Sequence, residues 1–260
     1  ISLQLCSNEL FCYKIKFMIK LIGECTINLF ESLKFIFSKN FRFKECINQI
    51  ANIGADSLAI AGTIVFITGA VISLQLSKQF AMSGTEGYIG GVVTFAIIRE
   101  LGPGFAALAI SARSGTAMAA EVANMKITQQ IDAMKTLGVS PIGYLFAPRL
   151  VAATIAIPLV SIIAQLIGII GGIIVAYATV ELHPNMFIYS IWTFMDAKDL
   201  FIGIIKAAAF GLLISLVCCT QGYLTNGGAK EVGIATTKAA MYSTIVLFIC
   251  DLILSWIFFT

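Results

Sequence analysis

The sequence predicts an all-α membrane protein with about five transmembrane helices, an N-terminal interfacial helix and a short helix in a polar loop between two spans. Composition, the lengths of the apolar segments and the distribution of Lys and Arg support this prediction. Of 260 residues, 58% are hydrophobic and only 12% are charged, with a mean hydropathy of +0.93. A soluble domain carries about a quarter charged residues, so lipid is expected to solvate most of this chain. The net charge of only +3 gives no reason to expect a nucleic-acid partner.

A membrane span needs about 20 mostly apolar residues. The segments that satisfy this length are 57–77, 88–112, a stretch within 144–178, 200–224 and 239–259. The third is long enough for a tilted span followed by a broken or re-entrant turn near Pro158. GxxxG spacing at Gly87/Gly91 and at Gly168/Gly172 suits close helix packing, either within the chain or in a dimer.

Residues 1–52 form an N-terminal region that differs from the membrane domain at 53–260. Within 10–52, Phe, Ile and Leu alternate with charges such as Lys14, Lys20 and Glu24. The charges recur too often for a span, yet the segment is too apolar for a free tail. It is expected to form one or two helices in the headgroup layer, with a sixth span as the alternative.

The Lys and Arg residues predict the orientation of the chain. With five spans, the N-terminal region and the loops at 113–149 and 225–238 share one side. That side carries 13 of the 17 basic residues: Lys14, Lys16, Lys20, Lys34, Lys39, Arg42, Lys44, Arg113, Lys126, Lys135, Arg149, Lys230 and Lys238. The opposite side has only Lys78 and Lys198. The basic side is therefore expected to face the cytosol or its topological equivalent.

The polar interruption at 113–140 is expected to be a loop that contains an amphipathic helix. Thr128 is expected to cap this helix, Asp132 to lie near its positive end, and Gly138 to close it. Such a helix outside the bilayer indicates docking of a soluble partner. A solvated loop helix without a partner is the plainer alternative.

Charged residues within spans are the second candidate site, because each costs a few kcal/mol at mid-bilayer unless it is paired or hydrated. The candidates are Arg99, Glu100, Lys206 and Asp251. They form either a buried ion-pair cluster that holds the helices together or a polar patch that lines a cavity. Asp56 and Lys78 lie near span ends and are expected to reach the interface instead.

The sequence does not favour an enzyme. Its single histidine, His183, precedes a proline in a predicted loop, and no G-x-S-x-G or H-E-x-x-H motif occurs. No Gly-Lys pair exists, so the chain has no Walker A loop, and any ATP would be bound by another polypeptide. The seven cysteines include no CxxC pair and predict neither a metal site nor a disulfide framework.

The region from Arg99 to Ala152 resembles MlaE-type permeases, the membrane subunits of ABC lipid transporters that work with MCE-domain proteins. The family pattern runs ELGP, A-R-x-G-x-A-x-A-A-E, E-Q-I-D-A-L, and a Pro–Tyr–Leu run into P-R. The matching stretches here are Glu100–Gly104, Ala112–Glu121, Gln129–Met134 and Pro141–Arg149. Gln129 stands where the family favours Glu, and Met134 where it favours Leu. The resemblance covers roughly 45–260.

This resemblance implies a homodimer, a cytosolic or stromal ABC ATPase partner that binds ATP, an MCE-domain lipid-binding partner, and phospholipid as substrate. It implies no cofactor bound by the chain itself. The residues carried over to the substrate cavity are Arg99, Glu100, Lys206 and Asp251. Those carried over to the ATPase-coupling region are Glu121, Lys126, Gln129, Asp132, Lys135 and Leu137.

Two other functions remain open from the sequence. One is an ion-coupled carrier or channel that uses the four intramembrane charges as its path. The other is an anchor that only recruits a partner, although charges retained within spans argue against it. The high usage of Ile, Phe, Lys and Asn is typical of an AT-rich genome. Together with an N-terminus unlike a transit peptide, it favours the bacterial inner membrane or the plastid inner envelope.

Overall fold

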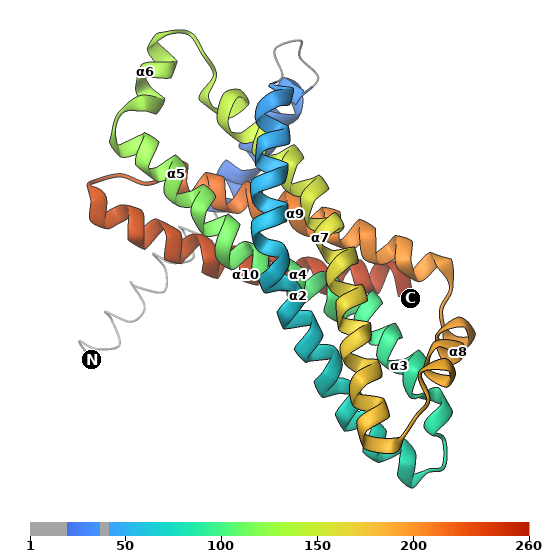
Figure 1. The fold of residues 1–260 in the computed structure, drawn as a ribbon. Coiled ribbons are helices and arrows are strands. Elements are labelled where there is room, and N and C mark those ends of the chain that lie inside the picture. The colour runs from blue at the N-terminus through green and yellow to red at the C-terminus, as the bar shows by residue number, and fades with distance from the viewer. Residues whose placement is uncertain (1–19, 37–41, 260) are drawn as a thin grey trace, which may run out of the picture.

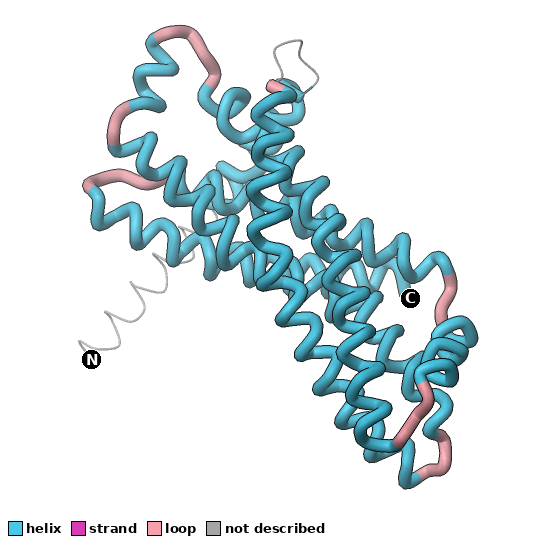
Figure 2. The backbone as a smooth tube through the Cα atoms, viewed as in Figure 1, coloured by secondary structure: helices cyan, strands magenta, loops and turns pink. Residues whose placement is uncertain are grey.

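The computed structural model describes residues 20–36 and 42–259, and every regular element in these ranges is a helix (Figure 2). Part of the predicted interfacial segment, including residues 10–19 and 37–41, therefore lies outside the described residues. After the helix at 20–36, the elements are α2 (Phe43–Met82), a 3-10 turn (Glu86–Tyr88), α3 (Ile89–Ala96), a π-helical turn (Ile97–Leu101), α4 (Gly102–Ile110), a second π-helical turn (Ser111–Gly115), α5 (Thr116–Ile127), α6 (Gln130–Thr136), α7 (Pro141–Val180), α8 (Pro184–Phe194), α9 (Ala197–Tyr223) and α10 (Ala229–Phe259).

Among the described residues, five helical segments are long and apolar enough to cross a membrane. They are Phe43–Met82, Glu86–Ile127, Pro141–Val180, Ala197–Tyr223 and Ala229–Phe258, and each corresponds to one predicted span, the last two ending one residue earlier than predicted. The first three have 40 to 42 residues. At 1.5 Å per residue they are about 60 Å long, twice the hydrocarbon core, so they extend beyond the bilayer.

The first half of the predicted polar loop is helical, which corrects the prediction of a loop from residue 113. The helical segment of the second span continues through α5 to Ile127, and the polar loop is limited to residues 128–140 (Figure 1). Met118 and Val122 are buried in the core, while Arg113 pairs with Asp56 and Glu121 pairs with Arg149. Because these ion pairs satisfy the charges, the helix does not need to end where the sequence becomes polar.

Two other helix boundaries also differ from prediction. No broken turn forms near Pro158: α7 is one continuous helix that contains both Pro148 and Pro158. A proline removes only one backbone hydrogen bond, and packed neighbouring helices tolerate it in a span. At the N-terminal end, α2 begins at Phe43, so residues 43–52 belong to the first span rather than to a separate interfacial helix.

The helix at 20–36 lies against the bundle by one side. Asn28 is buried and donates a hydrogen bond to Thr220 of α9. The apolar side chains of Ile22, Ile27 and Phe30 are exposed. An apolar outer side with a docked inner side suits a helix in the headgroup layer.

Glycine contacts hold the long helices α2 and α7 together, and these helices run side by side in Figure 1. A Cβ placed on Gly69 would collide with the carbonyl oxygen of Gly168, and one on Gly168 would meet Val65. Gly172 also faces Gly69 and Val93. The Gly168/Gly172 motif therefore serves packing within the chain, one of the two predicted uses.

The two ends of the bundle carry different elements. Residues 128–140, which contain α6 and are called the α6 loop, lie at one end together with the start of α2. The helix α8 lies at the other end, beside α3 (Figure 1). The sequence analysis did not identify α8 as a helix. Phe187 of α8 is fully buried, and its backbone approaches Gly90, where a Cβ would not fit. Tyr189 and Trp192 on the other side of α8 are 75% and 81% exposed, which suits a helix at a membrane surface.

Candidate functional site

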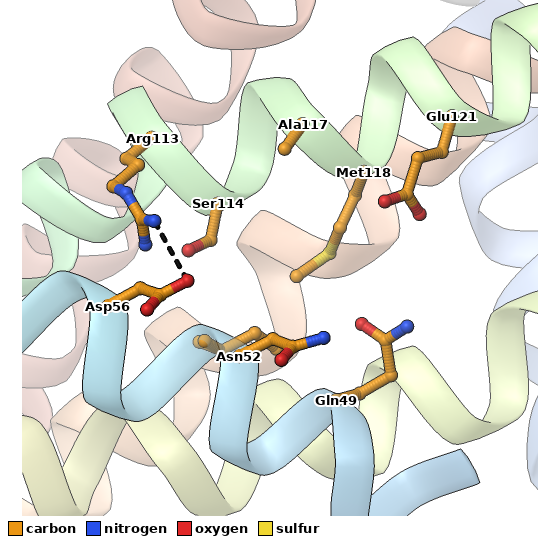
Figure 3. Close-up of a pocket in the computed structure, with 9 residues that line it drawn as sticks. Gln49, Asn52, Asp56, Arg113, Ser114, Ala117, Met118 and Glu121 are labelled. Carbon is orange, nitrogen blue, oxygen red and sulfur yellow. Dashed lines mark ion pairs between the residues drawn. The ribbon is translucent and has the colours of Figure 1, made fainter.

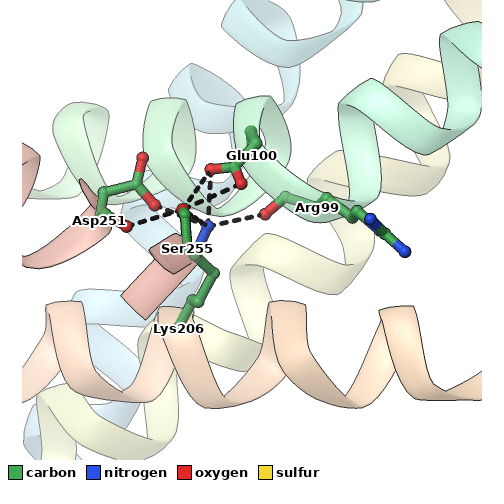
Figure 4. Close-up of polar contacts among 5 residues, drawn as sticks. All are labelled: Arg99, Glu100, Lys206, Asp251 and Ser255. Carbon is green, nitrogen blue, oxygen red and sulfur yellow. Dashed lines mark hydrogen bonds and ion pairs between the residues drawn. The ribbon is translucent and has the colours of Figure 1, made fainter. Parts of the chain in front are cut away.

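Lys206 of α9 forms the centre of a charged cluster inside the bundle (Figure 4). Its side chain is fully buried. Its ammonium lies 2.6 Å from Glu100 Oε2 and 2.8 Å from Asp251 Oδ1, and it donates a 2.8 Å hydrogen bond to Ser255 Oγ. The Ser255 hydroxyl also contacts Glu100. The cluster thus joins the second, fourth and fifth spans through one cation.

The two carboxylates of this cluster are more accessible than the lysine. The side chain of Glu100 is 39% exposed and that of Asp251 is 22% exposed. Pairing offsets the cost of burying Lys206, which would otherwise be a few kcal/mol or more within a membrane. The arrangement presents acidic and hydroxyl oxygen atoms outward and keeps the neutralising cation inside.

The side chain of Arg99 does not join this cluster, although Arg99 and Glu100 are adjacent in the sequence. Its side chain extends away from Glu100 in Figure 4, and its guanidinium lies 2.6 Å from Asp199 at the start of α9. It also lies over the Phe95 ring at 3.9 Å. The carbonyl oxygen of Arg99 accepts a hydrogen bond from Lys206. The structure therefore brings together Glu100, Lys206 and Asp251 and places Arg99 in a separate ion pair.

Sequence reasoning missed Asp199 and Ser255 as partners in this region. Asp199 lies in the first turn of α9, where it forms a reciprocal capping box with Asp196. The D-x-x-D spacing before an apolar run indicates such a cap, but not its ion pair with Arg99. Ser255 is four residues after Asp251 and on the same helix face, a spacing that was available in the sequence.

A π-helical turn positions Arg99 and Glu100. The turn at Ile97–Leu101 widens the second span where it carries both charges, and a second such turn at Ser111–Gly115 carries Arg113. Such turns occur frequently at functional sites. Gly102 follows the first turn and lies so close to Gln165 of α7 that a Cβ would not fit. The two π-helical turns of the second span therefore carry its charged residues Arg99, Glu100 and Arg113.

The predicted coupling region divides into a protruding loop and the helix α5, which is buried on one side only. In the loop, Asp132 lies 3.0 Å from Lys126, and the Leu137 side chain is 79% exposed. Lys135 lies over the Tyr223 ring at 5.4 Å, and its hydrogen bond to Tyr223 raises the pKa of Lys135. Glu121, by contrast, lies in α5 and pairs with Arg149 at 2.8 Å. The loop thus presents an apolar tip beside fixed charges.

The start of α6 differs from the prediction, but its end agrees. Thr128 does not cap α6, because it ends α5 and its hydroxyl donates to Asn124 O. Gln129 instead occupies the N-cap position in a left-handed conformation, with φ of 59° and no side-chain cap. Asp132 lies in the first turn, as predicted. Gly138 ends the segment with φ of +75°, a conformation that favours glycine.

The permease family MlaE matches residues 46–257 of this chain. The chain belongs to the MlaE permease family. The match includes the Lys206 cluster, the α6 loop and all five candidate spans except a few terminal residues. This MlaE chain is accordingly the membrane component of an ABC transporter rather than its catalytic component, and a permease of this kind implies an ATPase partner.

Similar proteins come from bacteria and from a chloroplast. A probable ABC transporter permease protein of Rickettsia prowazekii is 38% identical over 213 residues, which are 82% of either chain. One of Synechocystis is 34% identical over 216 residues, 83% of this chain and 82% of the relative. The chloroplastic protein TRIGALACTOSYLDIACYLGLYCEROL 1 of Arabidopsis thaliana is 31% identical over 224 residues, 86% of this chain and 64% of that one. The chain is an integral membrane protein with bacterial and chloroplast homologues.

Proposed function

We propose that this MlaE permease moves phospholipids between its membrane and an MCE-domain partner. It does so as a homodimer, driven by a separate ABC ATPase. The Lys206 cluster is the observation that carries the proposal. A phospholipid needs polar groups for its headgroup next to apolar surface for its acyl chains. Glu100, Asp251 and Ser255 supply such groups within spans whose outer residues are mainly apolar.

Partial exposure of the cluster supports a homodimer. Charged side chains at membrane depth face protein or water rather than lipid. In the single chain, the carboxylates of Glu100 and Asp251 are partly exposed. The helix that carries Asp251, α10, also exposes large apolar residues, among them Ile245, Phe248 and Leu252. A second copy against this side would enclose the carboxylates in a shared polar cavity.

The α6 loop supports the proposed coupling to an ATPase. Leu137 offers an exposed apolar contact, and the same region carries the charges of Lys126, Asp132 and Lys135. An interface of this composition has an apolar centre and a polar rim. The loop lies at the end of the bundle that also carries the start of α2, the side expected to be cytosolic or stromal (Figure 1).

The name of one relative supports a glycerolipid substrate. The chloroplastic relative is named for trigalactosyldiacylglycerol, a glycolipid with two acyl chains. Mass spectrometry of the complex, purified gently with its native lipids, tests both the substrate and the partners. We expect phospholipid, two permease copies and a stoichiometric ATPase. A complex that lacks an ATPase and conducts ions would instead support the carrier or channel.

A further inference from the structure

A second polar site lies between α2 and α5, separate from the Lys206 cluster. One face of α2 presents Gln49, Asn52 and Asp56 to this space, and α5 and the turn before it present Arg113 and Glu121 (Figure 3). This space is a partly open cavity with a volume of about 440 Å³. This volume is within the usual range for small-molecule sites.

Ion pairs fix the charged residues at both ends of the cavity. At one end, Arg113 lies 2.9 Å from Asp56, and its side chain stays 39% exposed. At the other end, Glu121 Oε2 lies 2.8 Å from Arg149 of α7, while the Glu121 side chain is 56% exposed. Each pair therefore keeps an accessible charged group toward the cavity or its mouth, so the site holds accessible charges of both signs.

A smaller cavity of about 180 Å³ lies farther along the same face of α2, and Gln49 lines both cavities. Arg42, Tyr144 and Arg149 line the smaller cavity. Arg149 is only 7% exposed, and its Nε has no hydrogen-bond partner among the described residues. The other two guanidinium nitrogen atoms bond Leu145 O and Glu121. A buried donor without a partner in the protein is a candidate donor to a bound water molecule or a ligand.

The position along the span corresponds to the headgroup layer. The polar face of α2 runs from Arg42 to Asp56, about 20 Å at 1.5 Å per residue, and the apolar run of the first span starts at the next residue. Glu100 precedes Arg113 by 13 residues in the same span, or about 20 Å along the helix. The groove therefore lies nearer the basic side of the membrane than the Lys206 cluster does.

We propose that this groove, defined by Gln49, Asn52, Asp56, Arg113, Glu121 and Arg149, binds the zwitterionic headgroup of a phospholipid in the leaflet on the basic side. The Arg113 guanidinium and the Asn52 amide line the cavity and provide donors for a phosphodiester. Glu121 and Asp56 provide acceptors for an ammonium group. This site rests on the proposed function only for its lipid class, and it adds a second headgroup position, nearer the basic side of the membrane than the Lys206 cluster.

Charge and position favour a headgroup over a protein in this groove. The centre of a protein interface is depleted of charged residues, whereas this cavity has charges at both ends. The ATPase-coupling loop begins after Ile127, six residues beyond Glu121 along the helix. A partner at the loop would therefore lie beyond the cavity.

Photo-crosslinking tests the site in the full complex, reconstituted with its ATPase in nanodiscs. The probe is phosphatidylethanolamine with a photoreactive group near the headgroup, and peptide mass spectrometry locates the adducts. Ala117→Trp fills the cavity, because Ala117 is exposed and lines it. Ala178→Trp, at an exposed alanine near the end of α7, is the matched control. Asn52→Leu removes one donor at nearly constant size.

We expect adducts on the α2 and α5 peptides that bear this cavity. Ala117→Trp and Asn52→Leu should each lower their yield about tenfold, and Ala178→Trp should leave it unchanged. Soluble glycerophosphoethanolamine, added as a competitor, tests whether the site binds the headgroup alone or the whole lipid. Complete loss of the adducts at a low competitor concentration would contradict the assignment to a lipid. The site would be overturned if Ala117→Trp left the adducts unchanged. It would also be overturned if Ala117→Cys formed a disulfide between two copies of the chain and no lipid adducts were found. ATP-driven lipid transfer without adducts refutes the groove alone, whereas adducts without any transfer refute the proposed function alone.

Discussion

The ammonium group of Lys206 lies 2.6 Å from the carboxylate of Glu100, although 106 residues separate them in the sequence. This contact links α9 to the π-helical turn in the second span, and Asp251 of α10 adds a second carboxylate at 2.8 Å. Three spans therefore depend on one buried cation. The first prediction tests that dependence.

Lys206→Met should destabilise the purified complex by about 3–5 kcal/mol, because it leaves Glu100 and Asp251 close together without a cation. Lys198→Met is the control, since Lys198 is exposed in the first turn of the same helix. Thermal unfolding in detergent measures both variants. Equal midpoints for Lys206→Met and Lys198→Met would show that the cluster does not hold the spans together.

Asp132→Lys should weaken binding of the ATPase while the spans stay inserted. The substitution replaces the 3.0 Å ion pair with Lys126 by two like charges in the region that also exposes Leu137. Co-purification of the ATPase measures the effect, with Lys230→Glu as a charge reversal elsewhere on the same side. Glu121→Lys is unsuitable as a coupling test, because it would leave the buried Arg149 unpaired. Undiminished ATPase binding by Asp132→Lys would remove this loop as the contact.

Cysteines at Val139 and at Asn185 should react with an impermeant label from opposite sides of the membrane. Val139 is preferable to Ser140, because the Ser140 hydroxyl caps α7 by accepting from Gly143 N. The accessible native cysteines are replaced first. Labelling of Val139→Cys is expected only from the basic side. Labelling of both positions from one side would contradict five spans.

Gly168→Val should destabilise the chain by about 1–3 kcal/mol through overpacking between α2 and α7. Its added Cβ would meet Val65 and the adjacent backbone of α2. Gly233→Val is a control, because no atom lies within 4 Å of a Cβ placed there. Thermal unfolding of the purified chain again provides the measurement. Equal unfolding midpoints for Gly168→Val and Gly233→Val would show that Gly168 packs less tightly against α2 than it does in the structure.

The five spans and the central charges could be predicted from the sequence for physical reasons. Long apolar runs have few alternatives in a membrane protein, and a charge inside such a run needs a partner. Glu100, Lys206 and Asp251 were identified in this way, and they do lie together. The partner of each charge was not predictable, because that depends on how helices rotate against one another. Arg99 therefore pairs with Asp199 although Glu100 is its neighbour in sequence.

Helix ends near polar residues were the least predictable part of the fold. Asp56 was expected to reach the membrane interface; its side chain is 58% exposed, and the sequence did not predict its pair with Arg113 across the groove. This pair and the pair of Glu121 with Arg149 allow α5 to continue a span whose sequence has become polar. The short helix α8 has too few residues for a span and depends on Phe187 packing beside Gly90. These contacts between distant segments have no periodic pattern in the sequence.

ATP-dependent transfer of phospholipid by the reconstituted complex tests the central claim most directly. The permease, its ATPase and its MCE-domain partner are placed in liposomes with a fluorescent phospholipid, and its exchange with the MCE-domain protein is followed. We predict transfer that requires ATP and is abolished by Glu100→Arg, which places a second cation beside Lys206. ATP-dependent transfer that persists in Glu100→Arg would contradict the role of the cluster. Ion flux without any phospholipid transfer by the unmodified complex would contradict the proposed function itself.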